Sequence, residues 1–138
     1  AEVFARAGAR VVAADVQDAQ GRAVVEAIAA AGGQARFVAL DVTDAAQWAA
    51  AVAFAVEAFG GLTTLVNNAG IYHPGGVEEE TEAGWNRMVA VNQTSVWLGM
   101  RAAMPELVKS GNAAIVNISS LYGLIGSPGS LAYHATKA

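Results

Sequence analysis

Apolar residues along this chain occur in two kinds of stretch, which alternate from one end to the other. One kind is a short run that is apolar almost throughout, and such runs are typical of parallel strands buried on both faces. The other kind is longer and has apolar residues at helical spacing. The short runs predict strands over Arg10–Asp15, Ala35–Leu40, Thr63–Asn67 and Ala113–Ser119.

Helices are predicted in the stretches between the strands. Asp18 is expected to cap the first helix, and Thr43 or Asp44 the second, because short oxygen-bearing side chains accept from free N–H groups at helix starts. Paired glycines are expected to end both helices. The helices are expected over Ala19–Ala31, as far as Phe59, over Ala83–Lys109 and from Ser130 onward, after a short helical segment at the start.

Strands that alternate with helices predict an α/β fold with a doubly wound parallel sheet and helices on both faces. Ligands of such folds bind at the carboxyl ends of the strands. The long helix Ala83–Lys109 has apolar residues on more than one face, so we expect it to pack against the sheet and against another subunit. A homo-oligomer, a dimer or a homotetramer, is therefore expected.

Composition narrows the classes of function. The chain has 138 residues, of which 54% are hydrophobic and 14% charged, so it is expected to fold around a core. Its net charge of −4 argues against nucleic acid or an anionic membrane as partner. Without cysteine there are no disulfides and no thiolate chemistry, and two isolated histidines predict no metal site. No membrane span or signal peptide is expected, and the cytoplasm is the expected compartment.

Two aspartates end successive predicted strands. In a dinucleotide-binding fold, a carboxylate at the position of Asp15 accepts hydrogen bonds from the adenosine ribose and repels a 2′-phosphate. The alternative is that Asp15 is only a turn or capping residue. Asp41 occupies the same place one strand later, where its side chain could reach an adenine. The residues after Asp15, Val16 and Gln17, carry no positive charge, which favours NAD over NADP.

The segment Asn67-Asn68-Ala69-Gly70 follows the third predicted strand. Asparagine supports tight turns, and the small Ala69-Gly70 pair lets the backbone approach a ligand closely. An ordinary strand-ending turn is the alternative interpretation.

Tyr133 and Lys137 lie four residues apart, so on a helix they share a face. An ammonium beside a phenol favours the phenolate, which makes tyrosine usable as a general acid or base. Ser120 precedes Tyr133 by thirteen residues and lies at the end of a predicted strand. From there its hydroxyl could hold a substrate oxygen next to the phenol.

These motifs, in this order, resemble the short-chain dehydrogenase/reductase family along the whole chain. The motifs are Asn67-Asn68-Ala69-Gly70, the Asn92 of Val91-Asn92-Gln93-Thr94, Asn117-Ile118-Ser119-Ser120 and Tyr133-His134-Ala135-Thr136-Lys137. The resemblance implies a Rossmann-like fold and an oxidoreductase that moves a hydride between NAD and a secondary alcohol or ketone. NADP is the less favoured cofactor. Hydroxysteroid and cyclic-alcohol members are the most similar.

The resemblance also implies a catalytic tetrad. Tyr133 would exchange a proton with the alcohol or carbonyl oxygen, and Ser120 would polarise that oxygen. Lys137 would favour the ionised form of Tyr133 and hydrogen-bond the nicotinamide ribose. Asn92 would hold a water that links Lys137 to solvent, whereas Ser119 would be structural.

Cofactor contacts follow from the same resemblance. Asp15 would bind the adenosine ribose, Asp41 and Val42 the adenine, and Asn68, Ala69 and Gly70 the cofactor with their backbone, beside Tyr133 and Lys137. Two departures from the family pattern are evident, since no glycine-rich phosphate-binding turn and no later strands are present. Residues 1–138 are therefore expected to be an incomplete dinucleotide-binding domain, inactive or unstable alone, in which the strands flanking an absent central strand keep unpaired edges.

Other interpretations stay open. Within enzymes, the alternative is an NADPH-dependent 3-oxoacyl-carrier-protein reductase; outside them, it is a non-catalytic dinucleotide-binding protein. His73 and Tyr122 could each line the substrate pocket or serve only the loop and the core, and His134 is expected to point away from the reaction.

Overall fold

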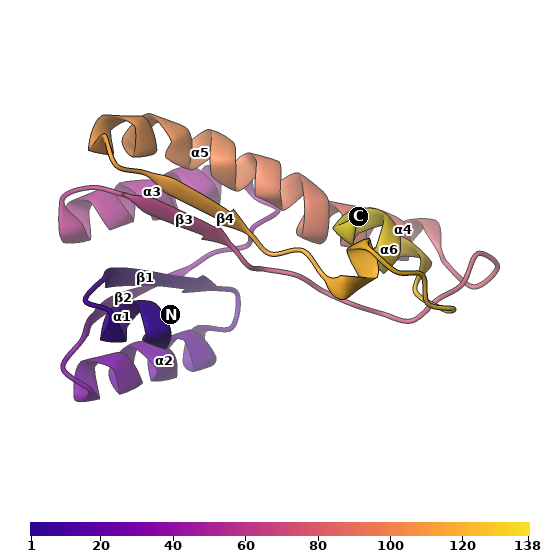
Figure 1. Cartoon of the computed structure of the whole chain (residues 1–138), viewed down its shortest axis with the longest axis horizontal. Helices are drawn as coiled ribbons and strands as arrows, with labels where there is room; N and C mark the ends of the chain where they lie inside the picture. Colours follow the sequence, from indigo (N-terminus) through magenta and orange to yellow (C-terminus); the bar gives the residue numbers. More distant parts are fainter.

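The computed structural model describes all of residues 1–138 as an α/β arrangement (Figure 1). Its elements in chain order are α1 (Glu2–Arg6), β1 (Arg10–Asp15), α2 (Asp18–Ala30), β2 (Gln34–Ala39), α3 (Ala45–Phe59), β3 (Thr64–Asn67), α4 (Glu82–Val89), the π-helical turn η1 (Ala90–Thr94), α5 (Ser95–Ser110), β4 (Ala114–Asn117), the 3-10 turn η2 (Leu121–Gly123) and α6 (Leu131–Lys137).

All strand pairing is parallel, as predicted. β1 pairs with β2 along its whole length, and β3 pairs with β4. The four strands do not form one sheet, because each pair is a separate two-stranded sheet. Each strand therefore has one edge without a neighbouring strand.

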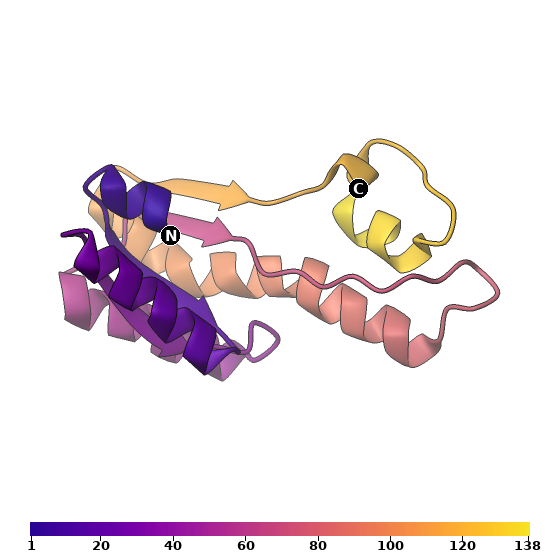
Figure 2. The same cartoon turned by 90° about the horizontal axis from the view of Figure 1, so that it is seen from below.

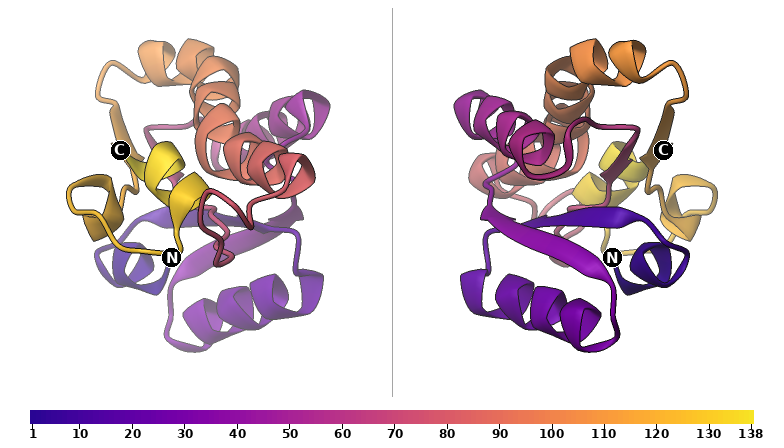
Figure 3. Two further views of the ribbon diagram at one scale, coloured as in Figure 1. Left: turned by 90° about the vertical axis from the view of Figure 1, so that its right-hand side faces the viewer. Right: turned by 90° about the vertical axis from the view of Figure 1, so that its left-hand side faces the viewer.

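Helices cover both faces of the strands. α3 and α5 lie on one side and α1 and α2 on the other (Figures 1 and 3). The larger core joins α3 and α5 to the strands and consists of Leu40, Trp48, Ala51, Leu65, Leu98, Ala103 and Leu107. A smaller core beneath α1 and α2 consists of Ala5, Ile28 and Ala35. Helices thus contact β1 and β2 from both sides, whereas β3 and β4 are contacted by α5.

The predicted long helix over Ala83–Lys109 is found as one helical stretch from Glu82 to Ser110, but its middle is not α-helical. α4 ends at Val89, the backbone then makes one π-helical turn, and α5 begins at Ser95. A π turn fits one extra residue into a helix and is frequent at functional sites. Here it contains Asn92, a residue that is only 3% exposed.

One of the two predicted helix caps is found, at the start of α3, and the other, at the start of α2, is not. Asp44 caps α3, because its Oδ1 accepts from the N–H groups of Ala46 and Gln47 at 2.7 and 3.2 Å. Asp18, predicted as the cap of α2, is instead the first residue of that helix. Its carboxylate accepts from the Arg22 guanidinium at 2.6 and 2.9 Å, so a partner one turn along the helix replaces the capping interaction.

The chain extends beyond the carboxyl ends of β3 and β4 as one arm. This arm contains α4, η2 and α6 (Figure 2). Two segments that are distant in sequence are joined within it, since Gly75 pairs with Ser130 in a parallel bridge at the start of α6. No helix has the length and apolar character that crossing a membrane requires.

Candidate active site

A cleft of about 520 Å³ lies at the carboxyl ends of β1, β2 and β3, with α4 and η1 along its other side. Every residue expected to bind a dinucleotide from the strand ends lines it: Asp15, Asp41, Val42, Asn68, Ala69 and Gly70. The sequence places these residues up to 55 positions apart, and the parallel topology brings them to one edge.

Asp15 is the last paired residue of β1. Its Oδ1 accepts from the N–H of Gln17 at 2.9 Å, which fixes the turn after the strand. Oδ2 has no partner in the protein and remains able to accept from a ligand hydroxyl. The turn role and the ribose role are therefore compatible in one carboxylate.

Asp41 is held in place by Thr43. Its Oδ1 accepts from the Thr43 N–H at 2.9 Å and from the Thr43 hydroxyl at 2.7 Å. These two hydrogen bonds are the main cause of a pKa below the ordinary value for Asp41, with a smaller contribution from the positive charge of Arg87. Asp41 is therefore a fixed carboxylate at the edge of the cleft.

Arg87 was not among the predicted site residues. It projects from α4, is exposed, and lines the same cleft without a carboxylate in ion-pair range. Its only signal in the sequence was its position five residues before Asn92. It places a cation in a cleft whose other charged groups are Asp15 and Asp41.

Gly70 lies where the cleft meets two of the tetrad residues. A Cβ built on it would lie 3.5 Å from Asn92 Oδ1 and 3.5 Å from Lys137 Nζ. A side chain would thus fill the space between the amide and the ammonium, which glycine leaves free. The open space beside Gly70, together with the unpartnered oxygen of Asp15, fits a dinucleotide that runs along the cleft.

Asn92 ties three segments together. Its Oδ1 accepts from the Ile71 N–H at 2.8 Å, and its Nδ2 donates to the Ile71 carbonyl at 2.9 Å. The second Nδ2 hydrogen is directed to Thr136 Oγ1 at 3.2 Å. Both amide hydrogens are therefore used inside the protein, and only Oδ1 keeps capacity to accept from a water.

Lys137 is buried, with only 8% of its surface exposed. Its Nζ donates to the Ile118 carbonyl at 2.9 Å and lies 6.0 Å from the centre of the Tyr133 ring. A buried ammonium with one protein acceptor has N–H groups left for a ligand. The predicted spacing on one helix is found, because α6 contains both residues.

Tyr133 lies between two other tyrosines. The ring of Tyr72 meets it edge-on with 5.3 Å between centres, and that of Tyr122 does so at 6.1 Å. Tyr72 is 54% exposed, and its hydroxyl is 3.3 Å from Ser130 Oγ. The phenol of Tyr133 therefore lies among aromatic surfaces that are open to an apolar ligand.

The two serines after β4 make different contacts. Ser119 Oγ donates to the Lys137 carbonyl at 2.7 Å and so fastens the loop to α6. Ser120 Oγ accepts from the Tyr122 N–H at 3.2 Å and keeps its own hydrogen for another acceptor. Ser120 thus has the free donor that a substrate oxygen would need.

The two histidines are both bound within the protein. His73 Nε2 lies 3.0 Å from both oxygens of the Glu80 carboxylate, so His73 closes its own loop. His134 contacts the loop that precedes α6. No cluster of three or more metal-ligating side chains is present.

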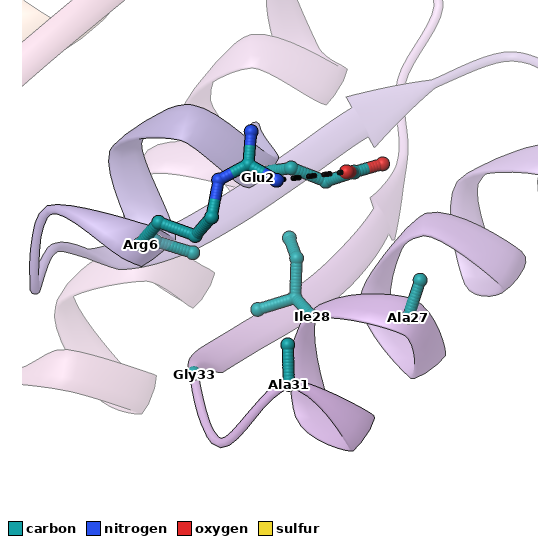
Figure 4. Close-up of a pocket in the computed structure, with 7 residues that line it drawn as sticks. Glu2, Arg6, Ala27, Ile28, Ala31 and Gly33 are labelled. Atoms are coloured by element: carbon teal, nitrogen blue, oxygen red, sulfur yellow. Dashed lines mark ion pairs between the residues drawn. The ribbon is translucent and has the colours of Figure 1, made fainter.

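A second, much smaller cavity of about 50 Å³ lies between α1 and α2 (Figure 4). Arg6 and Glu2 border it and form an exposed ion pair of 3.9 Å. The cavity is remote from the strand ends and holds no group with unmet bonding capacity, so it carries no site.

Proteins of one known family are similar to this chain. The chain matches the short chain dehydrogenase family over residues 1–138. It is 61% identical over 138 residues to 2,5-dichloro-2,5-cyclohexadiene-1,4-diol dehydrogenase LinX of Sphingobium indicum, covering all of this chain and 55% of that protein. It is 48% identical over 130 residues to the 3-alpha-(or 20-beta)-hydroxysteroid dehydrogenase of Mycobacterium tuberculosis, covering 94% and 49%.

The likeness extends to structure. A crystal structure of a short-chain dehydrogenase/reductase from Burkholderia xenovorans superimposes with a TM-score of 0.93 at 36% identity. The match covers 98% of this chain and 54% of that one. The chain spans about half the length of the curated relatives it matches.

Proposed function

The chain belongs to the short-chain dehydrogenase/reductase family, and on this premise we propose that it provides the cofactor cleft and catalytic centre of an oxidoreductase. The reaction transfers a hydride between NAD and a secondary alcohol or ketone. The observation that carries the proposal is the meeting of Asn92 and Lys137 at Gly70, beside the dinucleotide cleft and on the helix that bears Tyr133.

The protein's part in the reaction is to hold the substrate oxygen and move its proton. Ser120 donates its free hydroxyl hydrogen to that oxygen. In the oxidation, the Tyr133 phenolate takes the alcohol proton, and the buried Lys137 ammonium stabilises the phenolate. In the reverse reaction the phenol returns the proton. Nicotinamide, when bound, accepts or supplies the hydride.

Asn92 serves this centre mainly by position. Its three hydrogen bonds hold the loop after β3 against α6, so that Gly70 and Lys137 keep their separation. A water that relays protons from Lys137 would donate a hydrogen bond to Asn92 Oδ1, which accepts only one other hydrogen bond, from the Ile71 N–H.

NAD is the proposed cofactor. Asp15 has one unpartnered carboxylate oxygen in the cleft, which can accept from a ribose hydroxyl and repels a 2′-phosphate. Arg87 is the one cation lining the cleft, and it lies on α4 beside Asp41 rather than in the turn after Asp15.

A cyclic secondary alcohol is the proposed substrate class. The relatives are named as dehydrogenases of a cyclohexadienediol, a hydroxysteroid and, at 40% identity, cyclopentanol. The exposed ring of Tyr72 and the ring of Tyr122 beside Tyr133 offer flat apolar surfaces, which suit an alicyclic ring.

The test compares two tyrosines that receive the same change. In the full-length protein, Tyr133→Phe is expected to lower turnover of cyclic secondary alcohols by about 10²- to 10⁴-fold, the contribution of general acid–base catalysis. NADH binding, followed by fluorescence, is expected to persist. Tyr122→Phe is the control, because its hydroxyl makes no hydrogen bond, and it should retain most activity. Undiminished turnover in Tyr133→Phe would refute the mechanism.

Self-association is proposed through α5. Trp97, Met104 and Val108 are 52%, 44% and 71% exposed along this helix, and Arg101 stacks over Trp97 at 4.4 Å. A dimer or tetramer would cover these side chains. Light scattering of the full-length protein is expected to show an oligomer that Val108→Glu weakens; a monomeric parent protein would contradict the proposal.

A further inference from the structure

The loop between β4 and α6 contains Ser120 but has little structure of its own. Only the three-residue turn η2 is regular, and the loop includes Gly123, Gly126 and Gly129. Leu124 and Ile125 near its tip are 86% and 50% exposed, so no core holds them. The position of Ser120 must therefore depend on specific contacts between the loop and the rest of the fold.

His134 makes the contacts that reach farthest into this loop. Its Nδ1 lies 2.6 Å from the Tyr122 carbonyl. Its Nε2 lies 2.9 Å from the Ser127 nitrogen and 3.0 Å from the Ser127 carbonyl. The imidazole also packs against the Tyr122 ring, with 5.0 Å between centres and a 35° tilt. The His134 side chain thus contacts the loop at two residues, Tyr122 and Ser127, which are five positions apart.

The hydrogen bonds of His134 select one tautomer of its imidazole ring. The Ser127 N–H can only donate, so Nε2 must accept and cannot carry a proton. Nδ1 then carries the proton and donates to the Tyr122 carbonyl. The neutral Nδ1–H tautomer serves the Ser127 N–H and the Tyr122 carbonyl and gives no hydrogen to the Ser127 carbonyl, whereas the Nε2–H tautomer would serve the Ser127 carbonyl alone.

These contacts of His134 with Tyr122 and Ser127, here called the His134 clamp, connect two residues of the proposed catalytic centre. His134 directly follows Tyr133 on α6, and the Tyr122 that it holds donates its N–H to Ser120 Oγ at 3.2 Å. Ser119, by contrast, fastens only the first part of the loop, through the Lys137 carbonyl. We infer that His134 is a positioning residue, which sets the distance between the Ser120 hydroxyl and the Tyr133 phenol by clamping the loop through both ring nitrogens. This inference rests on the proposed function.

Two substitutions separate the hydrogen bonds from the packing. His134→Phe keeps a ring against Tyr122 and loses both hydrogen bonds, whereas His134→Gln restores one donor and one acceptor. In the full-length protein, His134→Phe is expected to lower kcat by about 10- to 100-fold, the loss that a misplacement of about 1 Å can produce. The KM for NAD should stay the same, and His134→Gln should recover part of the loss. A purely structural role would not lower kcat while leaving the KM for NAD unchanged.

A second measurement does not depend on turnover. Exchange of the Ser127 amide hydrogen is expected to be at least about tenfold faster in His134→Phe than in the parent, because its acceptor is gone. The matched control is His73→Phe, because His73 bonds Glu80 and not Ser127, so the exchange rate of the Ser127 amide should stay unchanged. Nitrogen NMR of the parent protein is expected to show the proton of His134 on Nδ1.

The outcomes are distinguishable. Absence of turnover in the parent would refute the proposed function, while exchange and NMR would still decide whether the clamp exists. An unchanged kcat in His134→Phe, an unchanged Ser127 exchange rate, or a proton on Nε2 would each overturn the inference. If His134→Phe does not fold, the tautomer of the parent and the kcat of His134→Gln decide, and an Nε2–H tautomer refutes the clamp.

Discussion

Gly123 is the position at which a single methyl group should damage the catalytic centre most directly. This glycine ends η2, three residues after Ser120, and lies against the last turn of α6. A Cβ built on it would collide with the Lys137 carbonyl oxygen and lie 2.8 Å from the carbonyl carbon. Its backbone conformation is not left-handed, so the obstacle to Gly123→Ala is contact and not strain.

The size of the effect follows from that contact. Real Cβ atoms essentially never come within 3.0 Å of such an atom. Because the obstacle is backbone, no side-chain rotation relieves it, and the loop or the end of α6 must move by about 1 Å. Either movement separates Ser120 from Lys137, and a displacement of that size can cost about 10²-fold in rate.

The assay compares Gly123→Ala with Gly126→Ala in the full-length protein. Gly126 belongs to the same loop, and a Cβ there meets nothing within 4 Å. We expect kcat to fall about 100-fold in Gly123→Ala and to stay near that of the parent in Gly126→Ala. NAD affinity should fall less than kcat, because the residues that line the dinucleotide cleft lie at the strand ends, α4 and η1, and only Tyr133 and Lys137 reach the cofactor from α6. Equal kcat values for the two variants would refute the reasoning.

Three further predictions concern the cleft and the core. Asp15→Ser should raise kcat/KM with NADP relative to NAD, since repulsion of a 2′-phosphate is removed; an unchanged ratio would make Asp15 a turn residue only. Gly99→Ala should lower the midpoint of thermal unfolding despite better helix propensity, because its Cβ would lie 2.9 Å from the Trp48 ring; a higher midpoint would contradict this. The lowered pKa of Asp41 means that its contribution to stability is present at neutral pH and lost as pH falls through that pKa. Thr43→Val should raise the pKa of Asp41 in an NMR titration, and no upward change would show that the Thr43 hydroxyl has no effect.

The local features that were predicted correctly depend on short-range physics. The spacing of Tyr133 and Lys137 needs only a helix to place both on one face, and α6 provides it. The Asp44 cap and the end of α3 at Gly60, whose φ is 81°, follow from side-chain and backbone preferences that act within a few residues.

Features that depend on distant partners were not predicted. The π turn around Asn92 has no glycine or proline to mark it, and its side chain is held by Ile71 and Thr136, each more than twenty residues away. Arg87 enters the cleft only because α4 crosses the strand ends. The role of His134 depends on a loop whose path has no periodic pattern. Each of these needed the packed chain to be recognised.

The central claim is that residues of this chain direct hydride transfer from a secondary alcohol to NAD. It is tested by incubating the full-length protein with NAD and cyclic secondary alcohols that carry deuterium on the carbinol carbon. Mass spectrometry should find that deuterium in the reduced cofactor, together with the ketone, and find neither with Tyr133→Phe. A folded, NAD-binding protein that transfers no deuterium from any of these alcohols, or transfers it equally well without the Tyr133 hydroxyl, would contradict the account.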